Sequence, residues 1–398
     1  MRNKRSAAIW AAVSAAILIG FTYWVVIDIG KADGEVERPL NTMTPRGDKA
    51  WKIFDLMVPV YAVAGLVFVA VLVGLLWIAR RFKGSDDDIE GVDEPEQVHG
   101  NTKLEIGWTL APAVLLAFLA VFNVQTILAM DDSEDPLEVT VIGNQWWWEY
   151  RYDTDDDGTV DIITATEAAI PVGRDIIFNI QSNDVIHSFW IPQLNGKLDA
   201  VPGRTHQLVI SADEPGLYEG QCTEYCGLSH GVMRMQVKAL EQADYDAWLK
   251  HMQTPPEQPT DELALAGQEL FVTQCTMCHQ VDGILPGDTA PFEYSDEPDP
   301  NYGETVDTVT TSGAAPNLTH FMARQKFAGG LLDLYQGDQD PMVFPWEEAE
   351  PDVNNIKRWL RDPLEVKPMN PDNNQGMPNY NLSEEQIDQL TAFLLTLR

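Results

Sequence analysis

The sequence predicts a membrane-anchored protein of several domains: apolar helices that span a bilayer, an all-β domain of Greek-key type, and a small all-α domain at the C-terminal end. Three observations support this prediction. Long apolar runs occupy roughly the first third of the 398-residue chain, short alternating stretches follow from Pro136 to about Lys238, and amphipathic helical patterns follow residue 262. Such changes of pattern along one chain mark separate domains.

Three apolar runs near the start of the chain are each long enough to cross a bilayer as a helix. They cover about Ala7 to Ile29, Ile53 to Ala79 and Ile106 to Met130. The basic cluster Arg80–Lys83 follows the second run, and such clusters stay on the cytoplasmic side of a membrane. We therefore expect a transmembrane helical hairpin over residues 51–130, with the rest of the chain on the outer side.

The first apolar run, within residues 1–30, allows two interpretations. It follows a basic start, Met1–Arg5, and so resembles a signal peptide. Its apolar part is longer than that of most signal peptides and no convincing cleavage site follows, which favours a retained extra transmembrane helix. Either alternative places Gly34–Lys49 outside, so the expected topology is the same.

Residues 136–240 have the pattern of an all-β domain. Short alternating stretches predict strands at Leu137–Ile142, Ile176–Ile180 and His206–Ile210. Turn signals such as Pro202-Gly203 separate some of them. About a hundred residues of this kind predict a Greek-key sandwich or barrel.

Five residues with metal-binding donors are concentrated in one short loop of this domain. They are Cys222, Glu224, Cys226, His230 and Met233, and His187 lies upstream. Two thiolates, two imidazoles, a thioether and a backbone carbonyl exceed what one tetrahedral ion binds. If both sulfurs bridge, the donors divide between two copper ions, with Met233 as the weak ligand on one side and the Glu224 carbonyl on the other. Such a pair shares one electron with little change of shape, so the loop predicts a dinuclear copper site for electron transfer.

Three other interpretations of this loop leave donors without a role. A disulfide between Cys222 and Cys226 does not explain His187, His230 or Met233. A mononuclear blue-copper site needs one cysteine, and a zinc site has no need of a methionine. The dinuclear copper site is therefore the favoured interpretation.

A proline-rich linker, residues 252–261, leads to a C-terminal domain at residues 262–398. Helical patterns are expected at Glu262–Cys275 and Val353–Leu360. The last helix should begin with a capping box at Ser383–Gln386. These helices describe a small all-α domain.

The motif Cys275-Thr-Met-Cys278-His279 is the attachment pattern of a c-type haem. Both sulfurs add to the haem vinyl groups, and His279 becomes the proximal ligand of the iron. A methionine as the sixth ligand raises the potential. Met377, in Gly376-Met377-Pro378, is the best candidate, with Met369 and Met342 as alternatives.

The formal net charge of −35 excludes nucleic acid as a partner. All four cysteines fall in the two metal motifs, so no structural disulfide is expected. The acidic stretch Asp153–Asp161 follows the first positions of a calcium loop, but Thr164 stands where the bidentate glutamate belongs. An acidic hairpin turn is the better interpretation of that stretch.

With these motifs, the chain resembles subunit II of haem-copper cytochrome c oxidases, in the caa-type version with a fused C-terminal cytochrome c domain. The sequences His187-Ser-Phe-Trp-Ile-Pro and Lys197-Leu-Asp-Ala-Val-Pro-Gly-Arg204 also look like this family. The resemblance implies a cupredoxin fold for the β domain. It also implies a CuA centre with these ligands: His187, Cys222, Cys226, His230, Met233 and the carbonyl of Glu224.

The resemblance gives roles to three further groups. From the residues alone, Trp146 in the run Trp146–Trp148 serves equally well for packing or for an electron path, and the resemblance implies electron entry at Trp146. Glu105 would lie at the mouth of a proton channel in subunit I. The side chain of Glu224 would help to bind a magnesium ion at the interface with subunit I.

The expected function is that of an electron-entry subunit of a terminal oxidase in the bacterial cytoplasmic membrane, with both metal domains outside. Electrons would pass from an external donor, such as a soluble cytochrome or a cytochrome bc complex, through haem c to CuA and on to subunit I, where oxygen is reduced to water. Subunit III is a further expected partner. The alternatives are the electron-accepting subunit of a CuA-containing nitric oxide reductase and a stand-alone membrane-tethered redox carrier.

Overall fold

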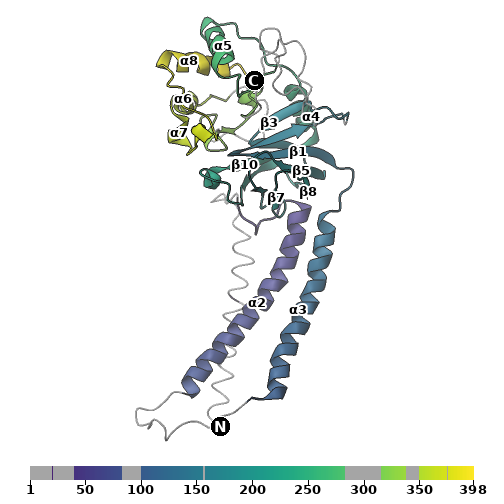
Figure 1. Ribbon diagram of the computed structural model, residues 1–398. Coiled ribbons are helices and arrows are strands. Elements are labelled where there is room, and N and C mark those ends of the chain that lie inside the picture. The colour runs from purple at the N-terminus through teal and green to yellow at the C-terminus, as the bar shows by residue number, and fades with distance from the viewer. Residues whose placement is uncertain are drawn as a thin grey trace, which may run out of the picture. The chain divides into compact units, whose positions relative to one another are not determined.

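The computed structural model describes residues 40–82, 100–155, 157–282, 315–337, 349–373 and 375–398, together with Gly20 (Figure 1). Two compact units result: one contains Trp51–Asp132, and the other combines Pro39–Ala50 with Ser133–Arg398. Apart from Gly20, the expected segment 1–30 lies outside the described residues, as does Met342.

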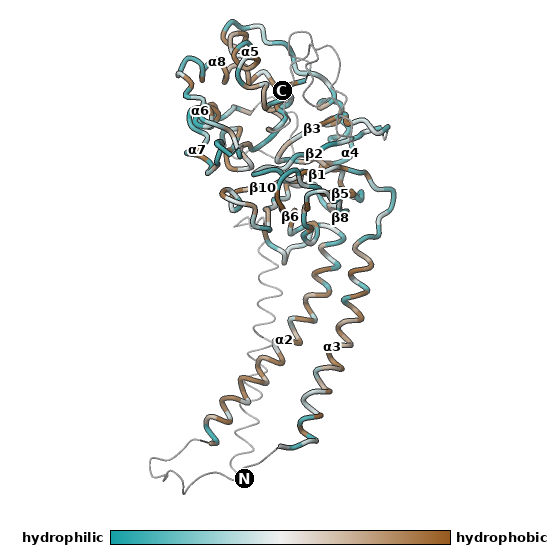
Figure 2. Tube along the Cα trace, in the orientation of Figure 1, coloured by the Kyte–Doolittle hydropathy of each residue, from teal (hydrophilic) through white to brown (hydrophobic). Residues whose placement is uncertain are grey.

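Helices α2 (Asp48–Arg81) and α3 (Thr102–Met130) are long and apolar enough to cross a membrane. Apolar side chains run along both helices (Figure 2), and large ones such as Phe68, Trp77 and Leu116 are exposed. A helix that is apolar around its circumference is stable when lipid surrounds it. Two of the three expected spans are therefore present as helices.

The β domain consists of two main sheets with a shared apolar core. One sheet has the strand order β3-β2-β1-β5-β8 and the other β4-β10-β9, while β6 and β7 form a separate pair. The strands are β1 Leu137–Asn144, β2 Trp147–Tyr152, β3 Ile162–Ala165, β4 Glu167–Pro171, β5 Ile176–Ser182, β6 His187–Phe189, β7 Leu198–Ala200, β8 His206–Ile210, β9 Gly216–Gln221 and β10 Arg234–Leu240.

The register of β1 brings buried side chains of three strands together in this core. Val141 lies opposite Tyr150 of β2 and beside Ile180 of β5, and all three side chains are fully buried. Helix α4 (Gln242–Met252) closes the domain by packing Trp248 against Tyr152, with ring centroids 5.2 Å apart. Aromatic pairs at this spacing add stability beyond the area that they bury.

The C-terminal domain is built on the crossing of α5 (Glu262–Gln274) and α8 (Glu384–Leu394). A Cβ on Gly267 would collide with the carbonyl oxygen of Gln389, so glycine permits the close approach of the helices. Phe271 and Phe393 pack beside this point.

The remaining described elements lie in both domains. The β domain also contains the 3-10 turn η2 His230–Val232, between β9 and β10. The C-terminal domain also contains α6 Val353–Arg361, α7 Pro363–Val366, β11 Lys326–Phe327, β12 Leu332–Asp333, and the 3-10 turns η3 Phe321–Ala323 and η4 Pro371–Asn373.

The predicted order of membrane helices, β domain and helical domain is confirmed. The predicted capping box is also present, since Ser383 Oγ accepts the Gln386 N–H and the Gln386 side chain accepts the Ser383 N–H. The C-terminal domain departs from an all-α fold in one respect, the β11–β12 hairpin. Its strands have two residues each, too few to show period-2 patterning in the sequence.

Candidate metal centres

The loop between β9 and β10 brings the two cysteines of the first motif together. Cys222 Sγ and Cys226 Sγ lie 3.8 Å apart, and both side chains are buried. A disulfide needs a sulfur separation of about 2.05 Å, so both sulfurs remain free to bind metal. The backbone carbonyl of Glu224 lies 3.3 Å from Cys222 Sγ. This loop therefore presents two sulfurs and a carbonyl oxygen to the same small volume.

The other predicted donors surround the two sulfurs. His187 Nδ1 lies 4.0 Å from Cys222 Sγ, and His230 Nδ1 lies 3.5 Å from Cys226 Sγ. The thioether of Met233 lies 3.9 Å from Cys226 Sγ. His187 comes from β6, whereas His230 and Met233 come from the β9–β10 connection. All six donors thus converge, and a soft, sulfur-rich set of this kind suits copper.

The pKa values of the two cysteine thiols shift in opposite directions. Hydrogen bonding from Cys226, His187 and the Ser188 and Glu224 backbone lowers the pKa of Cys222, although burial opposes this shift. The hydrogen bond with Cys222 raises the pKa of Cys226, and burial adds to the rise. One thiolate is therefore available at neutral pH to begin metal binding.

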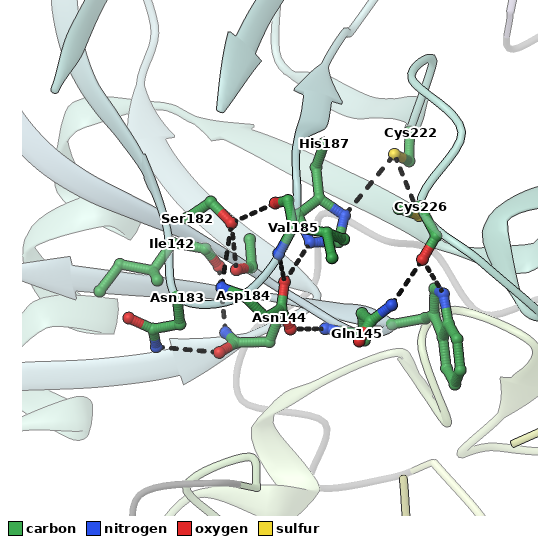
Figure 3. A network of polar contacts seen from close by, with 12 residues as sticks. Ile142, Asn144, Gln145, Ser182, Asn183, Asp184, Val185, His187, Cys222 and Cys226 are labelled. Atoms are coloured by element: carbon green, nitrogen blue, oxygen red, sulfur yellow. Dashed lines mark hydrogen bonds and ion pairs between the residues drawn. The ribbon is translucent and has the colours of Figure 1, made fainter. Parts of the chain in front are cut away.

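Asp184 holds the ring of His187, a contact that the sequence pattern did not reveal. Its Oδ1 lies 2.7 Å from His187 Nε2, which leaves Nδ1 facing the sulfurs (Figure 3). The same carboxylate accepts the N–H groups of Gln145 and Val185, each at 2.6 Å. Burial opposes protonation of His187, but the hydrogen bonds with Asp184 and Cys222 raise its pKa. Carboxylates in this position orient metal-binding histidines and increase their basicity.

Trp146 lies directly against the sulfur loop and is only 2% exposed. Its indole Nε1–H donates to the carbonyl of Cys226 over 3.0 Å, and Gln145 Nε2 donates to the same oxygen over 2.7 Å (Figure 3). A Cβ added to Gly227 would contact the indole ring at 3.1 Å. Tryptophan and cysteine backbone are thus in contact without intervening side chains.

The second motif lies at the end of α5. His279 Nδ1 donates to the carbonyl of Pro316 over 2.8 Å, which leaves Nε2 as the free ring nitrogen. Burial lowers the pKa of His279 and favours the neutral imidazole that binds iron. Cys275 and Cys278 have free thiols on the preceding turn. The residues present therefore fit covalent haem attachment.

The candidate methionines occupy different environments. Met377 packs against the core of the C-terminal domain, whereas Met369 packs against the core of the β domain. This difference favours Met377 as the haem ligand. Met342 lies outside the described residues.

Three predicted features outside these centres have structural roles of their own. Glu105 Oε1 accepts the Asn101 N–H at the start of α3, and the side chain of Glu224 is exposed. Carboxylate oxygens of Asp153, Asp155 and Asp161 lie within 4.8 Å of one another between β2 and β3. Asp153 also accepts backbone N–H groups within this turn.

The fold and these donor sets define a membrane-anchored redox protein with a β-sheet domain and a cytochrome c domain. Family models agree: the transmembrane domain of cytochrome c oxidase subunit II matches residues 43–126, its periplasmic domain residues 158–240, and cytochrome c residues 264–398. The chain belongs to the cytochrome c oxidase subunit II family. It is a component of a haem-copper oxidase and carries a C-terminal cytochrome c domain.

Similar proteins cover nearly the whole chain. The chain is 34% identical to cytochrome c oxidase subunit 2 of Alkalihalophilus pseudofirmus, over 91% of this chain and 92% of the relative. It is 33% identical to the protein of the same name from Bacillus subtilis, over 90% of this chain and 92% of that one. The periplasmic domain of subunit II from Bradyrhizobium japonicum, a solved structure, is 27% identical over 31% of this chain and 96% of that chain, with a TM-score of 0.28.

Proposed function

We propose that the chain is the electron-entry subunit of a terminal oxidase, receiving electrons from an external donor at its haem domain and delivering them through the copper centre to subunit I. The observation that supports this proposal most directly is the convergence of two free sulfurs, two imidazoles and a thioether, from the β9–β10 loop and β6, in one small volume. Membership of the family implies that subunit I, which reduces oxygen, is the partner.

In this proposal the two metal groups have distinct holders. His187, Cys222, Cys226, His230, Met233 and the Glu224 carbonyl hold a dinuclear copper centre. Cys275, Cys278, His279 and Met377 hold haem c. When bound, these groups each supply a one-electron redox couple. The chain itself orients two of the donors, through Asp184 on His187 and the Pro316 carbonyl on His279.

Trp146 is the proposed entry point to the copper domain, because its indole N–H contacts the carbonyl of a copper-holding cysteine. Two acidic groups face the partner in this proposal: Glu105 at the mouth of a proton channel and the Glu224 side chain as a magnesium ligand. Subunit III is a further proposed neighbour. The proposed location is the bacterial cytoplasmic membrane, with both metal domains outside.

Electron paramagnetic resonance of the purified chain tests the copper assignment. We expect the hyperfine pattern of one unpaired electron shared by two copper nuclei, together with the optical spectrum of a low-spin c-type haem. Cys222→Ser should abolish the copper pattern and leave the haem spectrum unchanged. One copper per chain, or zinc in its place, would refute the assignment.

The co-purified subunit I tests the reaction. Oxygen consumption with a reduced cytochrome donor supports the terminal oxidase. Turnover of nitric oxide in place of oxygen would contradict it, as would isolation of the chain in mild detergent without a haem-copper subunit.

A further inference from the structure

The segment Lys367–Gln375 of the C-terminal domain contacts the copper domain at several points. Lys367 Nζ donates to the carbonyl of Trp146 over 2.5 Å, and Gln375 Nε2 donates to Gln145 Oε1 over 3.0 Å. Between them, the carbonyl of Pro368 accepts the hydroxyl of Ser229. These partners are the proposed entry tryptophan, its neighbour, and a residue of the copper loop.

Lys367 is buried in this contact, with 3% of its surface exposed. Its Nζ donates both to Trp146 O in the copper domain and to Ala328 O, 3.4 Å away, in its own domain. Burial lowers the pKa of Lys367 to about 7. Ammonium and amine both carry N–H donors, so this bridge does not depend on titration. Removing it would leave a buried carbonyl unpaired, which costs free energy.

The turn after β11 is shaped to the same surface. Ala328, Gly329 and Gly330 all have positive φ angles, of 54°, 73° and 84°. A Cβ on Gly329 would collide with Lys367 Nζ and lie 2.9 Å from Trp146 O. Because glycine lacks this atom, the turn approaches the tryptophan backbone closely.

The copper domain returns hydrogen bonds to this hairpin. Arg234 N donates to Gly329 O over 3.1 Å, at the first residue of β10. Glu167 Oε2 accepts the N–H of Gln325 over 3.2 Å, while its Oε1 lies 2.7 Å from Lys238 Nζ. Glu167 and Lys238 are both buried, so this ion pair is shielded from solvent.

Gln375 connects the C-terminal domain to the copper loop through Gln145. Gln145 accepts from Gln375 through Oε1 and donates through Nε2 to Cys226 O over 2.7 Å. Met369, in the same segment, packs against the copper-domain core, whereas Met377 packs in its own domain. Met369 thus belongs to the domain contact and Met377 to the haem domain.

We propose that Lys367–Met369 together with Gln375 form a docking element that fixes the haem domain on the copper domain over Trp146, with Lys367 as its principal positioning residue. The two methionines that lie close together in the sequence have different roles in this proposal. Met369 packs the docking element against the copper domain, and Met377 packs within the haem domain. The identities of the two metal domains rest on the proposed function. The docking contact itself consists of protein atoms and can be tested without either metal.

Hydrogen exchange of the full-length protein in detergent, measured by mass spectrometry, tests the docking element. The amides of Arg234 and Gln325 are direct reporters, because each donates across the contact. Lys367→Met keeps the length and apolar character of the side chain but removes its donor. We expect exchange in peptides that cover these two amides to become about tenfold faster, while exchange in α5, α8, β1 and β5 stays unchanged.

Lys326→Met is the matched control, because Lys326 pairs with Asp333 inside the same β11–β12 hairpin. It should leave the two reporter amides as protected as in the unmodified chain. Gln375→Ala removes a less buried contact and should accelerate exchange at the same sites to a smaller extent. If Lys367→Met does not fold, as judged by loss of exchange protection in β1, β5, α5 and α8, the Gln375→Ala result decides.

Two results would overturn the docking element: unchanged exchange at both reporter amides in the folded variants, or equal acceleration in Lys326→Met. Loss of the expected copper and haem spectra in the unmodified protein would instead refute the proposed function. In that case the exchange data would still show whether Lys367 fixes one domain on the other.

Discussion

Oδ1 of Asp184 lies 2.7 Å from Nε2 of His187, and the other oxygen of the same carboxylate accepts the N–H of Gln145. One side chain therefore fixes both an imidazole of the proposed copper centre and the backbone beside the proposed electron-entry tryptophan. A shift of this carboxylate would move both groups together.

Asp184→Asn should weaken the copper site without unfolding the domain. The amide keeps the shape of the carboxylate but removes its charge, so His187 becomes a poorer donor. We expect copper affinity to fall by about 10- to 100-fold, as for other groups that support metal ligands. Competition with a copper chelator measures this change. Asp246→Asn on α4 is the control, and equal loss of affinity there would contradict the assigned role.

Met369 of the docking element and Met377 of the haem domain should respond differently to the same change. Met377→Leu keeps the side-chain volume but removes the sulfur, so the low-spin haem spectrum should be lost and the haem potential should fall. Met369→Leu should leave both unchanged, because this side chain packs on the copper domain. Optical spectra and redox titration measure the difference. The reverse pattern would make Met369 the haem ligand.

His320 should make stability depend on pH in the acidic range. Burial lowers its pKa to about 4, the nearby His251 and Arg324 act in the same direction, and its ring nitrogens face the carbonyls of Arg398 and Met252. The unfolded chain binds a proton near pH 6.5 and the folded chain does not, so this residue reduces the free energy of unfolding as the pH falls from about 6.5 to about 4. The loss amounts to roughly 3 kcal/mol over that window.

Thermal unfolding of His320→Gln between these pH values checks this expectation. The variant should lose part of the pH dependence and be less affected by acid than the unmodified protein. An identical pH profile would show that His320 does not titrate in this way.

Gly267→Ala should destabilise the haem domain by about 1–3 kcal/mol, because the added methyl group separates α5 from α8. Denaturant unfolding followed by haem absorbance measures the change. Gly216→Ala is the control, since a Cβ there meets its nearest neighbour at an ordinary 3.5 Å. Equal stability of Gly267→Ala and the unmodified protein would mean that the helices can separate without cost.

Local sequence patterns predicted several of the elements and named the candidate donor residues. The strand patterns of β1 and β5, the capping box at Ser383 and the spacing of the two cysteine motifs depend on neighbouring residues, so they can be read without a structure. The donors within the sulfur loop are also close in sequence. His187 was identified through the family resemblance as much as through spacing.

Contacts between distant residues could not be predicted in this way. Lys367 and Trp146 are separated by 221 positions, and neither residue type indicates the other. Aspartate is a common turn residue, so the presence of Asp184 in a turn does not point to its second role, the contact with His187. The β11–β12 hairpin has two-residue strands and also depends on contacts with distant residues, such as the hydrogen bond from Arg234 N to Gly329 O.

The burial of Trp146 affects how a soluble redox protein can reach the copper domain. With 2% of its surface exposed, this indole offers almost no area for a diffusing redox protein to touch. In the proposed function, a soluble cytochrome gives its electron to the attached haem domain first while Lys367 stays on the Trp146 carbonyl. In that arrangement the surface of the haem domain, and not that of the copper domain, selects the external electron donor.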